Sequence, residues 1–442
     1  MDGIGDPLFG LFARNFAPLD ERLEAITGRL EAIPRFLSEH RTRSALPQVR
    51  LWQEFELESA VEMPSLFDEI AAADAVLAEP ERRRLTAAAD RAKAAVADYE
   101  DFLKGTLATA VDAWPLGRER YDELVARRAF DGLDADRILE IGWEQLEQQR
   151  AARSAAAHQV DPTVDESTVV ERLKLDHPAT FEEALDQYRG AMLRARQHLI
   201  DHAIVTVPDD ERIEVMATPD YLRRVLPFAA YFDPPKFDVR PQGIYIVTPS
   251  VDGDPSAMRE HNRTSISNTS IHEGYPGHHL QLSVAGHHPS LTRLTTQAPE
   301  FVEGWGMYSE QLMREEGFDA GPAFRVAMHT DAIWRACRII LDVRMHRGEI
   351  GVDEATAWMV EQTGFETAHA RAEVRRYTYT PTYQLSYLLG KVLLLQLRDD
   401  QRRRLGDAFR LREFHDSLLR NGSLPISFHR RLLAGEGGPA PA

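Results

Sequence analysis

The most constraining feature of the 442-residue sequence is a helical repeat of apolar side chains that runs through most of its first 200 positions. In residues 18–45, 65–104, 134–158 and 179–203, apolar residues recur at helical spacing and charged residues lie between them. This spacing places the apolar side chains on one face of a helix, and the abundant Ala, Leu, Glu and Arg favour helix formation. We therefore predict a mainly α fold in which residues 1–205 form an N-terminal helical scaffold half.

The pattern changes near residue 205, where prolines become frequent and short β-like runs replace the helical repeat. Residues 243–248 (GIYIVT) are rich in β-branched and aromatic side chains, which favour a strand. We predict a small β-hairpin or sheet near residues 238–250, within a second and again helical half over residues 206–436. Because no flexible linker separates the two halves, we expect them to form one large helical body.

Charge and composition exclude several classes of protein. The formal net charge of −18 argues against a nucleic-acid or anionic-membrane partner, because both bind basic surfaces. The sequence contains no apolar run near the roughly 20 residues that span a bilayer, and its first residues lack the pattern of a signal peptide. We therefore predict a cytoplasmic protein without a nucleic-acid or membrane partner. A single cysteine, Cys337, excludes a cysteine-rich zinc site, so any metal is held by His, Asp or Glu.

The most distinctive segment is His-Glu-Gly-Tyr-Pro-Gly-His-His at residues 272–279. Five of the 16 histidines lie between residues 272 and 288. A His-Glu pair opens the zinc-binding helix of many metallopeptidases, in which the histidine binds the metal and the glutamate activates the metal-bound water. His272 and Glu273 are therefore candidates for a metal ligand and a general base. In the standard motif the second histidine follows four positions after the first, but Pro276 occupies that position here.

Regular helix geometry brings neither of the following histidines to the same metal as His272. From His272, His278 would lie about 240° around the helix, and His279 about 10.5 Å along its axis. Either the two glycines and the proline of the segment distort the helix, or these histidines do not share a metal. We favour a bulge that places His272 and His278 on one ion, with His279 as the alternative second ligand.

A third ligand is available on the downstream segment FVEGWGMYSEQ at residues 301–311. Glu303 lies between apolar side chains on a predicted helix, where a buried carboxylate requires a partner such as a metal. Glu310 follows seven positions later on the same face and is a candidate ligand or a partner of one. Two histidines and one glutamate with an open fourth position form a typical catalytic zinc site. We therefore predict one zinc ion held by His272, His278 and Glu303.

The motif and its surroundings resemble a known family. The segment HEGYPGHH, followed by FVEGW at residues 301–305, is similar to the signature of domain-of-unknown-function family 885. The resemblance extends to LDERLEAITGRLEAIPRFL near the start of the sequence, LGRERYDELV at residues 116–125 and RRYTYTPTYQLSYLLGK at residues 375–391. This family is regarded as related to helical zinc peptidases, which implies a helical body with a central substrate channel.

A second resemblance bears on the choice of ligands. In thimet-type oligopeptidases the zinc motif ends in Gly-His, and the glutamate ligand follows in a Phe-Val-Glu context. Gly277-His278 and residues 301–303 are similar to these two elements, although two extra residues separate Glu273 from Gly277. The resemblance implies His272, His278 and Glu303 as ligands and Glu273 as the base.

The resemblance also suggests roles for the tyrosine-rich segment at residues 375–387. Helical zinc peptidases of this group use a late tyrosine or histidine to stabilise the oxyanion, because a hydrogen-bond donor must lie near the developing negative charge. Tyr387 and Tyr383 are our candidates, with packing in the core as the alternative. Arg376 is a candidate for binding a substrate carboxylate, since a guanidinium makes bidentate hydrogen bonds.

Two further residues are candidate substrate contacts. Peptidases often bind the substrate backbone as an additional strand on an exposed sheet edge. Tyr245, on the predicted strand, would then line the cleft, and a purely structural hairpin is the alternative. His346 lies one helical turn after Asp342, whose carboxylate is able to orient the imidazole. His346 is therefore a second candidate for the wall of the cleft.

Together these residues predict a zinc-dependent hydrolase that cleaves the peptide bonds of short peptides, with Glu273 as the base and a tyrosine at the oxyanion. Short peptides are expected because a deep channel would exclude a folded protein. One alternative is a non-catalytic peptide-binding protein, although such a protein would not need Glu273. Another is an iron-dependent oxygenase, since two histidines and one carboxylate also hold iron.

Overall fold

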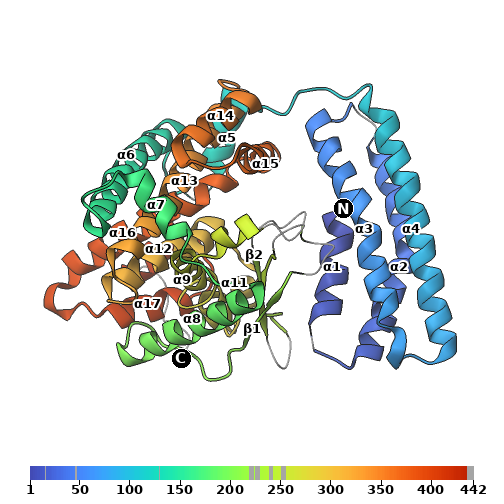
Figure 1. The fold of residues 1–442 in the computed structure, drawn as a ribbon, viewed down its shortest axis with the longest axis horizontal. Helices are drawn as coiled ribbons and strands as arrows, with labels where there is room; N and C mark the ends of the chain where they lie inside the picture. The colour runs from blue at the N-terminus through green and yellow to red at the C-terminus, as the bar shows by residue number, and fades with distance from the viewer. Residues whose placement is uncertain are drawn as a thin grey trace. The chain divides into compact units, whose positions relative to one another are not determined.

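The computed structural model describes most of the chain and is mainly α-helical with one small sheet, which confirms the predicted fold class (Figure 1). It describes residues 1–14, 16–44, 47–128, 130–218, 223, 229–237, 242–249 and 255–435. The contacts within the chain divide it into two compact units. The first comprises Met1–Trp114 with Thr218–Pro227, and the second comprises Pro115–Ala217 with Phe228–Ala442. Among the described residues, no helix combines the length and the apolar character needed to cross a membrane.

The first unit is a helical bundle, drawn in blue in Figure 1. It contains α1 (Asp2–Ala13), α2 (Leu19–Arg43), α3 (Arg50–Ala72), the short 3-10 helix η1 (Asp74–Val76) and α4 (Glu79–Leu107). The apolar stripe of α2 is buried as its spacing predicts, through Leu23, Ile26, Leu30, Ile33 and Leu37. The helix expected over residues 65–104 is interrupted between α3 and α4. The reason is Pro80, which fits the first turn of a helix and not its interior.

The second unit contains the sheet and the remaining helices. Its helices are α5 (Arg118–Arg127), α6 (Ala135–Val160), α7 (Glu166–Lys174), α8 (Phe181–Asp201), η4 (Pro255–His261), α9 (Arg263–Glu273), α10 (His278–Ala285), α11 (Leu291–Thr295), α12 (Pro299–Glu315), α13 (Pro322–His346), α14 (Val352–Thr363), α15 (Thr367–Tyr377), η5 (Tyr383–Leu385), α16 (Ser386–Leu405), η6 (Gly406–Ala408), α17 (Leu411–Arg420) and α18 (Ile426–Leu433). The boundary between the two units differs from the one expected at residue 205. The reason is that α6 precedes residue 205 but packs along α13, in the second unit. A Cβ atom at Gly142 of α6 would lie 2.9 Å from Ile339 of α13, so this glycine permits the close approach.

The sheet has three strands in the order β1-β3-β2. These are β1 (Ile213–Ala217), β2 (Ala229–Phe232) and β3 (Gly243–Val247). β1 runs parallel to β3, whereas β2 pairs with it antiparallel. The strand predicted at residues 243–248 is therefore confirmed, and all five residues of β3 are buried. Since β3 is the central strand, the expectation that its edge accepts a substrate strand is wrong.

Helices α12 and α16 form the second closely packed pair of this unit. Gly304 of α12 lies against Gly390 of α16, and a Cβ atom at Gly304 would lie 2.5 Å from the Gly390 carbonyl carbon. A Cβ atom at Gly390 would lie 2.0 Å from the carbonyl oxygen of Glu300. Two glycines facing each other thus allow the helix backbones to touch, which fixes the position of the α12 side chains.

Candidate metal centre

The HEGYPGHH segment forms a tight turn between two helices. α9 ends at Glu273 and α10 begins at His278, while the Tyr275–Pro276 peptide bond between them is cis. The Gly277 N–H donates to the carbonyl oxygen of Ile271 at 3.0 Å. A Cβ atom at Gly277 would lie 1.8 Å from the His272 carbonyl oxygen, so only glycine fits this position. The distortion predicted between Glu273 and His278 is therefore present.

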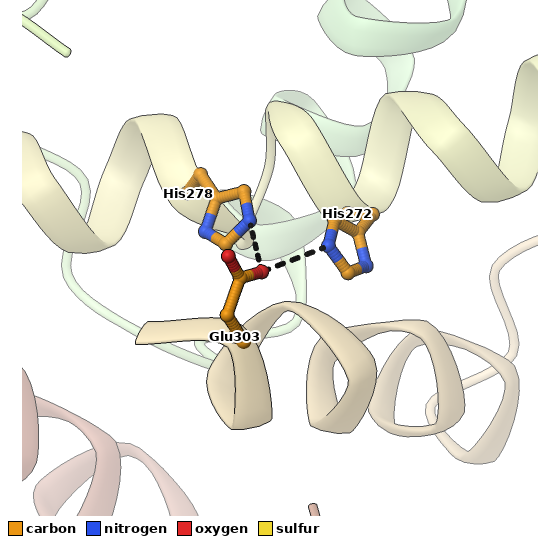
Figure 2. A group of neighbouring side chains, drawn as sticks. All are labelled: His272, His278 and Glu303. Atoms are coloured by element: carbon orange, nitrogen blue, oxygen red, sulfur yellow. Dashed lines mark ion pairs between the residues drawn. The ribbon is translucent and has the colours of Figure 1, made fainter. Parts of the chain in front are cut away.

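The turn brings His272 and His278 to the same place as Glu303 of α12 (Figure 2). The His278 Nε2 atom lies 3.3 Å from Glu303 Oε2, and the His272 Nε2 atom lies 4.0 Å from the same oxygen. One ligand atom from each residue lies within 4.8 Å of the other two. Over the part of the chain that the structure describes, this is the one group of three or more His, Cys, Asp or Glu residues with such geometry.

The sequence Glu303-Gly304-Trp305-Gly306 builds the side of the centre formed by α12. Gly304 sets the distance to α16, and Trp305 Nε1 donates to the carbonyl oxygen of Pro276 at 2.7 Å. A Cβ atom at Gly306 would lie 2.7 Å from Cε1 of His272. One turn of helix therefore supplies the carboxylate, anchors the α9–α10 turn and leaves room for the imidazole.

Glu310 orients the imidazole of His272, as expected of a residue on the same face as Glu303. Its Oε1 atom lies 2.7 Å from His272 Nδ1, which leaves Nε2 directed at Glu303. Burial alone would raise the pKa of Glu310, but the hydrogen bond and the charge of His272 outweigh burial and lower it. A carboxylate on the second nitrogen is the usual partner of a metal-binding histidine.

Opposite charges stabilise the pair formed by His278 and Glu303. Burial is the largest single effect and disfavours both charged forms, yet the hydrogen bond between the two side chains and the nearby opposite charges together outweigh it. The pKa of His278 is raised to about 9, and the pKa of Glu303 is lowered to about 2. The site therefore stabilises a positive charge next to Glu303, which a proton supplies in the metal-free protein.

Two of the predicted tyrosines lie at this centre. The Tyr383 hydroxyl donates to Oε1 of Glu303 at 2.6 Å, and the Tyr387 ring meets the Tyr383 ring edge to face at 5.8 Å. Tyr383 follows Thr382, whose backbone is left-handed at φ 69° and whose N–H donates to Asp342 Oδ2 at 2.9 Å. Asp342 thus holds the turn that presents Tyr383.

Glu273, the predicted base, is half-buried beside the metal ligands. Burial and the neighbouring Glu303 have the largest effects on the pKa of His278, and burial and Tyr188 have the largest effects on the pKa of Tyr245. The negative charge of Glu273 raises both pKa values further. Among the described residues, no side chain makes a hydrogen bond or ion pair with the Glu273 carboxylate. The carboxylate therefore remains available to a water molecule or a substrate.

His279, the alternative second ligand, belongs to a separate buried network. Its Nε2 atom lies 2.8 Å from Glu211 Oε2, and its Nδ1 atom lies 2.9 Å from the Tyr231 hydroxyl. Glu211 also accepts hydrogen bonds from the Tyr275 hydroxyl and, at 2.7 Å, from Arg196 Nε. Both imidazole nitrogens of His279 are occupied, so the structure places His278 and not His279 next to His272.

The other predicted site residues make their hydrogen bonds and ion pairs, as far as the described residues show, with groups other than the three ligands. Tyr245 is fully buried on β3, and His346 is fully buried with its Nε2 atom 3.0 Å from the Tyr377 carbonyl oxygen. Asp342 Oδ1 lies 3.8 Å from that nitrogen, which is within ion-pair distance but beyond the length of a hydrogen bond. Arg376 pairs with Glu373 at 3.1 Å and keeps 31% of its side chain exposed.

Glu211 is an important residue that the sequence did not single out. Burial would raise its pKa, but hydrogen bonds from His279, Tyr275 and Arg196 lower it to about 2. Glu211 precedes His279 by 68 positions, so no local spacing connects the two. The available signal was His279 itself, because a histidine in an apolar segment requires a polar partner.

Comparison with known proteins places this fold among bacterial proteins. Residues 1–433 match the model of a family described as "Bacterial protein of unknown function (DUF885)", which confirms the family resemblance. No curated protein matches the sequence. A "putative lipoprotein" from Colwellia psychrerythraea has a similar structure, with a TM-score of 0.81, 21% identity and coverage of 94% of this chain and 76% of that chain. A "putative lipoprotein of unknown function" from Shewanella oneidensis gives a TM-score of 0.76, 23% identity and coverage of 97% and 81%.

These two structures correct the predicted cytoplasmic location. Each protein is described as a "putative lipoprotein", and a lipoprotein is anchored to a membrane through covalent lipid instead of lying free in the cytoplasm. The prediction relied on the lack of a long apolar run. That argument addresses proteins that span a bilayer and says nothing about a lipid anchor.

Proposed function

This chain belongs to the DUF885 family of bacterial proteins of unknown function, and we propose that it is a zinc-dependent hydrolase that cleaves the peptide bonds of short peptides. The observation that carries the proposal is the convergence of His272, His278 and Glu303, with ligand atoms within 4.8 Å of one another. Two histidines and one glutamate form a typical catalytic zinc site. The resemblance of the Gly-His and Phe-Val-Glu elements to thimet-type oligopeptidases supports the same assignment.

The distances in the group suit one zinc ion. Tetrahedral zinc with bonds of about 2.0–2.1 Å separates its ligand atoms by about 3.3 Å. The His278–Glu303 separation is 3.3 Å, and the His272–Glu303 separation is 4.0 Å. The third separation, between His272 and His278, is within 4.8 Å, so the His272 imidazole would move toward the other two ligands when zinc binds. His272 offers Nε2 because Glu310 occupies Nδ1, which is the arrangement that a metal-binding histidine requires.

The residues around the group suit hydrolysis of an amide. A bound zinc ion would polarise the scissile carbonyl and lower the pKa of a water molecule. Glu273, with no competing hydrogen bond from the described residues, would take the proton of that water and pass it to the leaving amine. The Tyr383 hydroxyl, which donates to Glu303 in this structure, would turn to the oxyanion once zinc holds that carboxylate, with the hydroxyl of the neighbouring Tyr387 as a second donor.

The proposal is tested by measuring metal content and peptide cleavage together. Purified protein is stripped with a chelator, reloaded with zinc and incubated with a library of short peptides. We expect one zinc per chain and cleavage that disappears in Glu273→Gln, while this variant keeps its zinc. Glu361→Gln, which changes an exposed glutamate on α14, is the matched control and should cleave normally.

Other outcomes favour the alternatives. Protein that binds no zinc under these conditions, or a Glu273→Gln variant with full activity, would contradict the proposed mechanism. Bound iron with oxygen-dependent turnover would favour the oxygenase, since the same three ligands hold iron. Tight binding of peptides without any cleavage by the zinc-loaded protein would favour a peptide-binding protein.

A further inference from the structure

Two arginines share a single carboxylate beside the tyrosines of the metal centre. The Nη2 atoms of Arg338 and Arg376 lie 2.9 Å and 3.1 Å from the same Oε2 atom of Glu373. The Tyr377 hydroxyl donates to this oxygen as well, at 2.8 Å. Since one carboxylate balances one guanidinium, the cluster keeps one positive charge in excess.

The excess charge is most accessible at Arg376. The Arg338 side chain is only 4% exposed, and its guanidinium also donates to the Tyr377 hydroxyl and lies over the Trp334 ring. The Arg376 side chain is 31% exposed, and in the described structure its guanidinium donates hydrogen bonds only to Glu373. The remaining N–H groups of Arg376 are therefore available to an anion that enters from solvent.

This cluster adjoins the metal centre through two tyrosine rings. The guanidinium carbon of Arg338 lies 4.6 Å from the centre of the Tyr387 ring, which lies 5.8 Å from the Tyr383 ring. The Tyr383 hydroxyl in turn donates to Glu303. An extended peptide advances about 3.3 Å per residue, so these two separations in line correspond to about three residues, to which the steps from Arg376 to Arg338 and from the Tyr383 ring to Glu303 add. A group bound at the arginines would thus lie within a short peptide's reach of the metal ligands.

We propose that Arg376, held by Glu373 beside Arg338, binds the free C-terminal carboxylate of the substrate, so that the enzyme cleaves short peptides near their C-terminal end. A guanidinium recognises a carboxylate through two parallel hydrogen bonds, and every unmodified peptide carries one at this end. This inference rests on the proposed peptidase function. In the reaction, water adds its hydroxyl to the scissile carbonyl carbon, the C–N bond breaks, and the nitrogen gains the proton as the C-terminal fragment leaves.

Binding is measured first, because it does not depend on turnover. The zinc-loaded Glu273→Gln protein is titrated by calorimetry with N-acetyl-trialanine and with its C-terminal amide. We expect the acid to bind at least about tenfold more tightly, because the charge-assisted hydrogen bonds are lost in the amide. Adding Arg376→Gln should abolish this preference, while Arg376→Lys should retain part of it. Equal binding of acid and amide with Arg376 intact would overturn the proposal.

Arg371→Gln is the matched control. Arg371 lies on the same helix as Arg376 but pairs with the exposed Asp353 at 2.8 Å, so this variant should keep the full preference for the acid. With active enzyme, kcat/KM should likewise be at least about tenfold higher for the acid. Preferential binding of the acid without cleavage of either peptide would contradict the peptidase function alone. Equal cleavage of both peptides would contradict the carboxylate site alone.

Discussion

His278 and His279 are adjacent in the sequence, yet the turn that precedes them gives the two side chains different partners. His278 points to Glu303, whereas His279 lies between Glu211 and Tyr231. Both imidazoles are buried, so burial alone does not distinguish a metal ligand from a structural histidine. What distinguishes them is the neighbour of each Nε2 atom.

We expect His278→Ala and His279→Ala to affect different properties. Changing the hydrogen-bond partner of a metal ligand weakens metal binding by about 10–100-fold. Loss of His278 removes a proposed ligand itself, so it should weaken zinc binding by more than about 100-fold. Loss of His279 leaves the three proposed ligands intact, so zinc should remain stoichiometric while thermal stability falls. Competition with a coloured chelator and thermal unfolding measure the two effects. Zinc loss in the His279 variant but not in the His278 variant would reverse our assignment.

At the scale of single residues, the sequence identified those side chains whose chemistry is unusual in their local context. Glu303 was predicted because a carboxylate between apolar residues requires a partner. Glu211 was not, because its partners are brought to it by the fold from distant positions. Tyr245 was assigned to the cleft from its strand, but which strand becomes central depends on long-range pairing that local spacing does not encode.

Asp342 predicts a dependence of stability on pH. Burial raises the pKa of its carboxyl from 3.8 to about 7, although hydrogen bonds from Tyr121 and Thr382 oppose this effect. Because this pKa is higher in the folded state than in the unfolded state, the stability that the protonated Asp342 contributes is complete below about pH 4. It is lost as the pH rises through about 7. Asp342→Asn keeps an acceptor for Thr382 but carries no charge.

The free energies of unfolding of wild type and Asp342→Asn are compared by denaturant titration between pH 4 and pH 8. Relative to wild type, the free energy of unfolding of the variant should rise by up to about 4 kcal/mol between pH 4 and pH 8, because the variant avoids burying a charge. Unfolding of metal-free protein is the appropriate measurement, since zinc would add its own pH dependence. A difference between the two proteins that stays constant with pH would show that Asp342 does not titrate in this range.

At the scale of elements, α12 illustrates how one short motif serves two purposes. Gly304 allows α12 to approach α16, while Gly306, two positions later, leaves space for His272. The sequence predicted a helix here and a carboxylate on it. It did not predict the role of either glycine, because a glycine's function depends on which backbone or side chain lies opposite.

Gly304→Ala should therefore mainly lower the stability of the fold, whereas Gly306→Ala should mainly weaken zinc binding. Alanine in a helix normally stabilises by about 1 kcal/mol relative to glycine. In Gly304→Ala the new Cβ would instead force α12 from α16, and we expect a net loss of about 1–3 kcal/mol in unfolding free energy. In Gly306→Ala it would displace the His272 imidazole, and we expect zinc affinity to fall at least about tenfold. Wild-type zinc affinity in Gly306→Ala would contradict this packing account.

At the scale of the whole molecule, the sequence predicted the helical class but not how its helices are grouped. An apolar stripe indicates that a helix has a buried face without indicating which helix covers it. α6 precedes residue 205 yet packs on α13, so it belongs to the unit that carries the candidate metal centre. The helices α1 to α4 form the other compact unit.

This organisation predicts that zinc protects only one part of the chain from hydrogen exchange. At a zinc concentration about 100 times the Kd, binding stabilises the native state by about 2.7 kcal/mol, which slows exchange through linked openings about 100-fold. We expect this protection in peptides from α9, α10 and α12, where the ligands lie. Peptides from α2 are the internal control and should exchange at the same rate with and without zinc. Equal protection throughout the chain would contradict a site confined to the second unit.

The most direct test of the central claim is a zinc-edge anomalous difference map from crystals of the zinc-loaded protein. We predict one strong peak at about 2.0–2.1 Å from His272 Nε2, His278 Nε2 and a carboxylate oxygen of Glu303, with a fourth position open beside Glu273. A peak beside His279, or a map from zinc-loaded crystals without a peak at these three residues, would contradict the account.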